Sequence, residues 1–276
     1  MTATGIVRGK RMRLTRVGAC GLPIKGENST LVTKGFVSLN ITKVMKDAED
    51  LEQTNADGGV CIADRTPPEL KWFEFEAEFC RVDPEVLSFF TDDATVLDYA
   101  NRPVGFRSSK TVKVDAGAAV ELWTGVGADD CDVPEDDTAF EAGETGNAPY
   151  GYFLMPYIRE AVMGDFEIGA QVTTFKVSGI TGAAPKWGRG PYNVVPVDAK
   201  NKPGRLLTPF EADQHLHFQR TTIAPPAETD GAVALTLPQP YFGESALDVV
   251  GGEPGGGRLT LPGVDVLPGR GLIPRG

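Results

Sequence analysis

The sequence predicts a mainly β protein, a β-sandwich or barrel with one flanking α-helix. The chain of 276 residues has 33 glycines and 21 prolines, and long helices tolerate neither residue in their interior. Short segments of alternating apolar and polar residues recur between turn-rich stretches, which is typical of strands. A single short segment has the pattern of a helix. These observations exclude a helical bundle and favour one large β domain or two small ones.

Two segments near the N-terminus are predicted to form strands. Met12–Val17 is the first, and Phe36–Val44 is the second. The second alternates with period two, so its side chains point to opposite faces of a sheet. Its apolar face carries Val37, Leu39 and Ile41. Its polar face carries Ser38, Asn40 and Thr42.

Residues 47–59 are predicted to form the tip of a long hairpin or a surface loop. The stretch 47–52 is acidic, and residues 55–59 are a cluster of turn formers.

The segment Leu70–Phe79 has the clearest alternation in the chain. Its apolar face carries Phe73, Phe75, Ala77 and Phe79, and its other face carries Glu74, Glu76 and Glu78. Three carboxylates in a row repel one another, so we expect water to reach this face. It is either an ordinary solvated face or a wet concave surface whose function is to be negative.

Residues 83–91 are predicted to form a short helix. Asp83 suits the N-cap, Pro84 the first helical position, and Glu85 the positive end of the helix dipole. The apolar residues that follow are Val86, Leu87, Phe89 and Phe90. We expect this helix to cover one side of the sheet or barrel.

The rest of the chain divides at Pro225 and Pro226. Further strands are expected over 112–126, 150–158, 166–168, 172–180 and 216–223. We therefore assign residues 1–226 to the β domain and residues 227–276 to a Gly/Pro-rich extension or arm. In the extension, Leu-Thr-Leu-Pro occurs at 235–238 and again at 259–262. These short pieces cannot fold alone, so we expect them to lie on their own body or on a neighbouring copy.

Charge is unevenly distributed along the chain. The net charge is −11, and an acidic protein does not bind nucleic acid by counterion release. Residues 1–16 nevertheless contain no acid and five basic residues, namely Arg8, Lys10, Arg11, Arg13 and Arg16. We expect either a basic N-terminal arm that contacts an acidic surface of another copy, or a solvated N-terminus.

Patterns that indicate catalysis or a cofactor are weak. His215 and His217 would share a strand face with Asp213, as metal ligands can, but ordinary polar strand residues are the simpler interpretation. The acidic stretch 129–144 resembles a calcium loop only loosely, because Pro134 occupies a ligand position. Motifs for a nucleophilic serine or a phosphate-binding loop are incomplete. We expect no enzyme, no cofactor and no metal site.

The four cysteines, Cys20, Cys61, Cys80 and Cys131, lack the spacing of a zinc site. Buried thiols are the main expectation, and a Cys20–Cys61 disulfide is the alternative. Apolar runs long enough to span a membrane and a signal-peptide pattern are both missing, so we expect synthesis in a cytoplasm and no membrane partner.

Six segments occur in a fixed order along residues 10–226. They are Arg13–Gly21, Phe79–Leu87, Glu121–Thr124, Gly164–Ile168, Gly190–Val195, and His215–Phe218 followed by Pro225-Pro226. In this order they resemble the major tail tube protein of long-tailed, siphovirus-type bacteriophages that infect actinobacteria. Residues 227–276 have no counterpart in the resemblance.

The resemblance implies a structural protein of the virion tail, made in the host cytoplasm. Such proteins form hexameric rings that stack into a tube around a tape-measure protein, between tail-tip and tail-terminator proteins. Double-stranded DNA later passes through the tube without specific binding. The resemblance also implies that a long hairpin from each subunit joins an inter-subunit β-barrel around the channel.

Charge and resemblance together predict two functional surfaces. A conduit for DNA must not bind it, and fixed negative charge repels a polyanion at short range. The residues expected to line the lumen are Glu74, Glu76, Glu78, Ser38, Asn40 and Thr42. The residues expected to contact the next ring are Arg8, Lys10, Arg11, Arg13 and Arg16.

Two other classes of protein fit the sequence. One is a monomeric capsid-decoration or carbohydrate-binding β module, which would not polymerise. The other is a cupin-like metal enzyme that uses His215 and His217.

Overall fold

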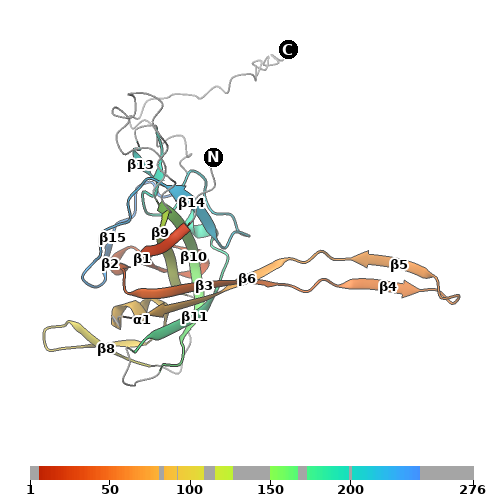
Figure 1. Ribbon diagram of the computed structural model, residues 1–276, viewed down its shortest axis with the longest axis horizontal. Helices are drawn as coiled ribbons and strands as arrows, with labels where there is room; N and C mark the ends of the chain where they lie inside the picture. Colours follow the sequence, from red (N-terminus) through yellow and green to blue (C-terminus); the bar gives the residue numbers. More distant parts are fainter. Residues whose placement is uncertain are drawn as a thin grey trace, which may run out of the picture.

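Strands make up most of the computed structural model, which describes residues 6–80, 84–91, 93–108, 116–126, 150–166, 173–198 and 201–242. Nine strands form one large sheet in the order β15-β2-β1-β9-β10-β11-β6-β3, with β14 paired to β10. All pairings in this sheet are antiparallel. Three two-stranded sheets stand apart from it, β4–β5, β7–β8 and β12–β13. The prediction of a mainly β fold is confirmed (Figure 1).

The strands of the large sheet are β1 (Ile6–Val17), β2 (Gly26–Thr33), β3 (Phe36–Met45), β6 (Leu70–Phe79), β9 (Gly117–Val126), β10 (Tyr150–Met163), β11 (Phe175–Thr181), β14 (His217–Thr221) and β15 (Val233–Leu235). The small sheets contain β4 (Asp50–Thr54), β5 (Val60–Arg65), β7 (Ala94–Leu97), β8 (Pro103–Arg107), β12 (Val195–Pro196) and β13 (Pro203–Gly204). The helical elements are α1 (Pro84–Phe90) and the 3-10 turns η1 (Ala19–Gly21) and η2 (Pro185–Trp187).

The large sheet buries side chains on both of its faces. Along β9, Val120 and Leu122 enter one hydrophobic cluster, which also holds helix α1. Ala119 and Trp123 point the opposite way, into a second cluster formed with the segment that contains η2. Successive residues of a strand alternate between faces, so a strand buried on both sides is apolar nearly throughout. Glu121 interrupts this pattern in the middle of β9.

Helix α1 confirms the predicted short helix. Pro84 occupies its first position, where the missing backbone N–H costs no hydrogen bond. Four apolar side chains predicted to face the sheet are buried, Val86, Leu87, Phe89 and Phe90. The ring of Phe90 stacks on Phe75 of β6 with the ring centroids 5.6 Å apart, which ties the helix to the sheet. Asp83, the predicted N-cap, lies outside the described residues.

Residues 36–79 form one long hairpin that extends well beyond the body (Figure 1). Its stem is β3 paired with β6, and its outer part is β4 paired with β5. The tip is a turn in which Asn55 Oδ1 accepts hydrogen bonds from the backbone N–H groups of Asp57 (3.1 Å) and Gly59 (2.8 Å). Gly58 supplies the positive φ of +80° that the turn requires. The predicted long hairpin is therefore confirmed with its tip at residues 55–59, whereas residues 50–52 of the predicted tip belong to strand β4.

The structure corrects the predicted position of one residue in the stem. Val37 was expected on the apolar face, but its side chain is 55% exposed. A register shift between Phe36 and Ser38 inserts Val37 as an extra residue in the ladder. Phe36 takes the position opposite Phe79 and packs against the core instead.

The described part of the C-terminal segment lies on its own body. Strand β15 pairs with β2, and Leu235 of the first Leu-Thr-Leu-Pro piece is buried. Farther along, Tyr241 donates a hydrogen bond from its hydroxyl to the carbonyl of Trp187 (2.7 Å). The second Leu-Thr-Leu-Pro piece, at 259–262, lies outside the described residues.

Candidate functional site

The two polar strand faces singled out in the sequence lie side by side. In the pairing of β3 with β6, Ser38 is opposite Glu78, Asn40 is opposite Glu76, and Thr42 is opposite Glu74. Directly opposite residues share a face of the sheet, so the six side chains form one surface. We call this surface the acidic ladder. Because Ser38 and Glu78 are 40 residues apart in the chain, strand register is what brings the two faces together.

Strand β11 extends the acidic ladder on its other side. Lys176 is opposite Glu78, Ser178 is opposite Glu76, and Ile180 is opposite Glu74. The Lys176 ammonium lies 3.4 Å from a carboxylate oxygen of Glu76, with both side chains about half exposed. An ion pair this exposed contributes at most about 1 kcal/mol. With three carboxylates and the one ammonium of Lys176, the surface keeps a net negative charge.

Hydrogen bonds hold the Glu78 carboxylate of the ladder in place. It accepts a short one from the Thr174 hydroxyl (2.6 Å) and a long one from the Ser38 hydroxyl (3.5 Å). Glu74 and Glu76 are exposed, while Phe75, Ala77 and Phe79 on the reverse of the strand are buried and Phe73 is half-buried. The alternation predicted for this strand is confirmed, and the ladder is a hydrated negative surface.

A shallow hollow of about 330 Å³ lies along the acidic ladder. Asn40, Thr42, Glu74 and Glu76 line one side of it, and Glu160 of β10 lines the other. Glu160 has a φ of +53° and pairs with Arg159 (3.2 Å). In the part of the chain that the structure describes, no group of three histidines, cysteines or acids has the geometry to hold a metal ion. The hollow widens the negative surface without making a ligand cage.

Residues 6–17 form strand β1, which lies between β2 and β9 inside the sheet and is not a free arm. Register shifts around Arg8 and Lys10 interrupt the ladder with β9 and leave both side chains exposed. Arg13, however, is 7% exposed, so the prediction that it contacts another ring is wrong. Arg11 and Arg16 are half-buried.

Arg16 also makes contacts within the subunit. Its Nη1 donates to the carbonyl of Ser88 (2.7 Å), and its guanidinium lies 4.3 Å from the ring centroid of Phe89. Burial lowers the pKa of Arg16, and the Glu85 carboxylate partly offsets that effect. Arg16 therefore fastens helix α1 to β1, and the exposed cations of the strand are Arg8 and Lys10.

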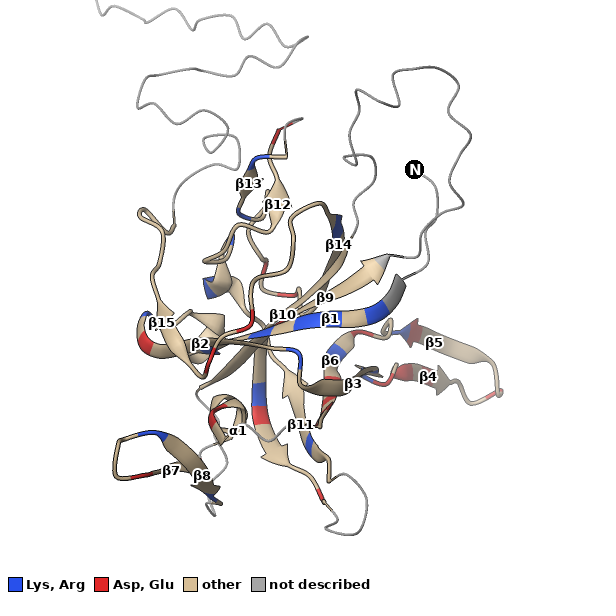
Figure 2. Ribbon diagram, turned by 60° about the vertical axis from the view of Figure 1, so that its left-hand side comes forward, with Lys and Arg blue, Asp and Glu red and all other residues tan. Residues whose placement is uncertain are grey.

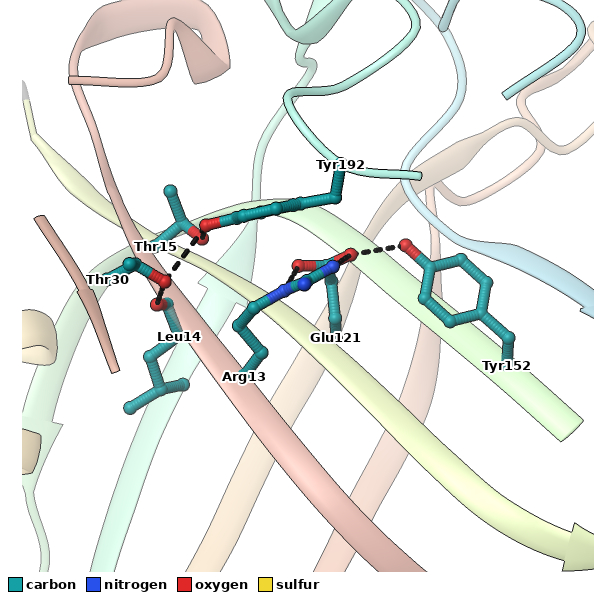
Figure 3. A network of polar contacts seen from close by, with 7 residues as sticks. All are labelled: Arg13, Leu14, Thr15, Thr30, Glu121, Tyr152 and Tyr192. Atoms are coloured by element: carbon teal, nitrogen blue, oxygen red, sulfur yellow. Dashed lines mark hydrogen bonds and ion pairs between the residues drawn. The ribbon is translucent and has the colours of Figure 1, made fainter. Parts of the chain in front are cut away.

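Arg13 is the centre of a buried polar network that sequence reasoning missed (Figure 3). Its guanidinium donates two hydrogen bonds to Glu121, at 2.5 and 2.7 Å, and Tyr152 donates a third to the same carboxylate (2.5 Å). The guanidinium carbon lies 3.3 Å from the ring centroid of Tyr192. Burial alone would lower the pKa of Arg13, but the Glu121 carboxylate outweighs burial and raises it.

The Tyr192 hydroxyl continues the network toward β1 and β2. It donates to Thr30 Oγ1 (2.9 Å) and lies 2.7 Å from Thr15 Oγ1, while Thr30 donates to the Leu14 carbonyl (3.0 Å). The loop that carries Tyr192 is thereby clamped onto the sheet. The only sequence signal for this network was Glu121, a charged residue inside the apolar run 118–123, because Arg13 stands among other basic and polar residues.

The two histidines have separate partners. His215 Nδ1 lies 2.9 Å from Thr181 Oγ1, and His217 Nε2 lies 3.0 Å from Gln219 Oε1. Burial, together with the positive charge of Arg159, lowers the pKa of His215. His217 begins β14, whereas His215 precedes the strand, so the shared strand face that the metal hypothesis required is absent from this described segment.

The cysteines differ from expectation. Cys20, Cys61 and Cys80 are exposed free thiols, which contradicts both the buried-thiol expectation and the Cys20–Cys61 disulfide. Cys61 lies on β5 in the outer part of the hairpin, and Cys20 lies in η1, which follows β1. Figure 1 shows β5 well away from β1. Cys131 and the acidic stretch 129–144 lie outside the described residues.

Comparison with known proteins does not identify a family. No protein-family model matches the sequence, and no curated protein matches it either. Among the helices of the described ranges, none is long and apolar enough to cross a bilayer.

Proposed function

We propose that this chain is the major tail tube protein of a long-tailed bacteriophage. Its copies form hexameric rings, and the rings stack into a hollow, negatively lined conduit for the genome. The protein is a structural part of the virion tail and performs no catalysis. The observation that carries this proposal is a long hairpin that leaves the body and bears the acidic ladder on its stem.

The hairpin supports assembly because it is incomplete by itself. All residues of β4 and β5 are exposed, including Leu51 (60%) and Ile62 (57%). An isolated two-stranded ribbon is marginally stable in water, and it gains stability when another surface covers it. Strand β3 stands at one end of the sheet order, and an unpaired strand edge is a template for another chain. Strands from six copies could close a barrel in this way.

The acidic ladder supports the role of a conduit. With Glu74, Glu76 and Glu78 in each of six copies, one ring would carry about 18 carboxylates on its inner wall. Fixed negative charge repels DNA over roughly 8 Å at physiological salt, so the DNA would pass without adhering. Ser38, Asn40 and Thr42 would keep the wall between the acids polar and hydrated.

The proposal implies a defined set of partners. Other copies of the chain are the main one, within a ring and between rings. A tape-measure protein would occupy the lumen before DNA, and tail-tip and terminator proteins would cap the ends. Arg8, Lys10 and Arg11 remain the cations of β1 proposed to contact the next ring.

Electron microscopy of the concentrated, purified protein tests the proposal. The expected result is six-fold rings or hollow tubes, either spontaneously or after addition of a tail-tip complex as nucleus. Replacement of Arg8 and Lys10 by Glu should abolish stacking and leave the subunit folded, since both side chains are exposed. A chain that stays monomeric with the nucleus present is a decoration or binding module instead.

A further inference from the structure

The tip of the β7–β8 hairpin presents a tyrosine almost entirely to solvent. The Tyr99 side chain is 96% exposed, the highest value among the large apolar side chains of the described residues. Leu97 (53%) and Val104 (58%) are exposed next to it on the same hairpin. Tyrosine is enriched at the energetic centres of protein interfaces because it buries much apolar area at little entropic cost.

The turn that carries Tyr99 is held in one conformation. Asp98 Oδ1 accepts hydrogen bonds from the backbone N–H groups of Ala100 (2.7 Å) and Arg102 (2.9 Å), and Asp98 Oδ2 accepts from Arg102 Nε (3.0 Å). Two backbone bonds close the turn, Asp98 N–H to the Arg102 carbonyl (2.9 Å) and Asn101 N–H to the Asp98 carbonyl (3.1 Å). A side chain on a pre-ordered turn loses little conformational freedom on binding.

The base of the same hairpin is anchored in the protein core. Phe106 of β8 packs against the cluster that contains helix α1. The base of the hairpin is therefore held on the core, and we call the exposed Tyr99 at its tip the knob.

A hollow of about 490 Å³ lies elsewhere on the molecule. Its walls come from the loop after η2 and from the C-terminal segment, including Pro191, Tyr192, Leu237, Pro238 and Pro240. Proline and tyrosine rings are surfaces on which an aromatic side chain packs well.

A cation also lines this hollow. Arg205 is 5% exposed, and its Nη1 donates to the Tyr241 carbonyl (3.0 Å). A guanidinium in the wall of a hollow attracts the face of an incoming aromatic ring. The hollow thus offers proline and tyrosine rings and one guanidinium, which are groups on which a tyrosine ring packs.

The β7–β8 hairpin and strand β13, which leads into the Arg205 wall of the hollow, lie on opposite sides of the subunit. Figures 1 and 2, which differ by a rotation about the vertical axis, both place β7 and β8 at the lower end. Both place β13, which directly precedes Arg205, at the upper end. A contact between a knob at one end and a hollow at the other joins copies head to tail and repeats without limit unless it closes.

We propose that Tyr99 of one copy inserts into the hollow of a second copy in the next ring, and that this contact locks the stacked rings. The inference rests on the proposed function, because it names the partner of a stacking contact. The polar groups of the tip favour a protein partner over a polysaccharide, since Asp98 and Arg102 already bond each other. The exposed groups that a partner could cover are therefore the Tyr99 ring and the aliphatic side chains of Leu97 and Val104.

Photo-cross-linking of assembled protein tests the contact directly. A benzophenone amino acid replaces Tyr99, and a second preparation carries it at Leu51 on β4 as a position control. We expect cross-links from position 99 to residues 191–193 or 236–240 of another copy, and none to these residues from position 51. Cross-links from position 99 that map elsewhere overturn the proposal.

Assembly measurements with matched variants complete the test. Tyr99→Ala should raise the protein concentration needed for stacking by about tenfold or more, whereas Tyr99→Phe should leave it near the wild-type value. Asn193→Trp, which fills the hollow from an exposed position, should reproduce the Tyr99→Ala defect.

The outcomes separate this inference from the proposed function. Tyr99→Ala protein that stacks at the wild-type concentration overturns the lock and leaves the tube proposal standing. Wild-type protein that forms no rings or tubes under any condition overturns both. Circular dichroism should show that each variant folds, because the substituted side chains are exposed.

Discussion

Arg13 and Glu121 form a buried ion pair, so each charged group contacts the other in place of water. Both side chains are nearly inaccessible, and the carboxylate receives hydrogen bonds from Arg13 and from Tyr152 (Figure 3). A buried pair of this kind contributes little net stability relative to apolar residues, but the loss of one partner leaves an uncompensated charge in the interior. The network therefore specifies where the loop carrying Tyr192 lies on the sheet.

A double-mutant cycle measures this coupling. Arg13→Met and Glu121→Gln should each reduce the free energy of unfolding by about 3–5 kcal/mol, since each leaves a buried charge without its partner. The double variant should lose clearly less than the sum, because no unpaired charge remains and the new amide oxygen can still accept the hydrogen bond from Tyr152. Urea unfolding gives the four values, and simple additivity would contradict the account.

Three tyrosines make stability sensitive to alkaline pH. Burial raises the pKa of Tyr152, Tyr192 and Tyr241 above the ordinary phenol value. In the folded protein these phenols stay neutral after those of the unfolded chain have ionised. Their contribution is complete below about pH 10 and is lost as pH rises from there toward the folded-state pKa values.

The free energy of unfolding, measured between pH 8 and 12, shows whether stability falls in this range. We expect the free energy of unfolding to fall above about pH 10, and Tyr241→Phe to reduce the slope of that fall. A slope that Tyr241→Phe leaves unchanged would contradict the burial of this phenol as a cause of the fall.

Strand β9 begins at Gly117, where the backbone leaves no room for a side chain. A Cβ at Gly117 would lie 1.9 Å from the backbone carbonyl oxygen of Ile158 on β10. The backbone must therefore shift if any side chain is added there. At Gly105 on β8, by contrast, an added Cβ would meet Val96 at an ordinary 3.7 Å.

Alanine at these two glycines gives a matched comparison. Gly117→Ala should lower the free energy of unfolding by about 1–3 kcal/mol through overpacking. Gly105→Ala should be close to neutral. Thermal or urea unfolding gives the free energy of unfolding of both variants. Equal destabilisation would mean that loss of glycine itself, and not the close approach of β9 to β10, is the cause.

The elements that the sequence predicted well are those with an uninterrupted local pattern. Strand β6 and helix α1 follow strict periods, so burial of Phe75 and Phe89 could be expected from spacing alone. Strand β2 was not predicted, because its first residues, Gly26 to Asn28, are exposed and polar. The N-terminal half of β1 was mistaken for an arm, because bulges at Arg8 and Lys10 break its alternation.

The candidate site was half predictable for a similar reason. Each polar face of the acidic ladder is a local alternation, and both were identified correctly from the sequence. Their juxtaposition depends on the register of β3 against β6, and the position of Glu160 depends on a strand much farther along the chain. The ion pair between Arg13 and Glu121 likewise joins residues 108 apart, which no local pattern reports.

At the scale of the whole molecule, three features lie apart from one another. The β4–β5 ribbon and the β7–β8 hairpin extend from the body in different directions (Figure 2), and the proline-lined hollow has Arg205, which directly follows β13, in its wall. Each feature exposes apolar groups that a second copy could cover. A subunit with several such surfaces gains stability by assembly, whereas a monomeric module would leave all of them in water.

The central claim is that the acidic ladder faces the inside of a tube, and a near-atomic electron-microscopy reconstruction of assembled protein tests it most directly. The account predicts that Glu74, Glu76 and Glu78 lie on the channel wall of a six-fold ring, with Ser38, Asn40 and Thr42 beside them. A reconstruction with these side chains on the outer surface, or with lysines and arginines around the channel, would contradict it.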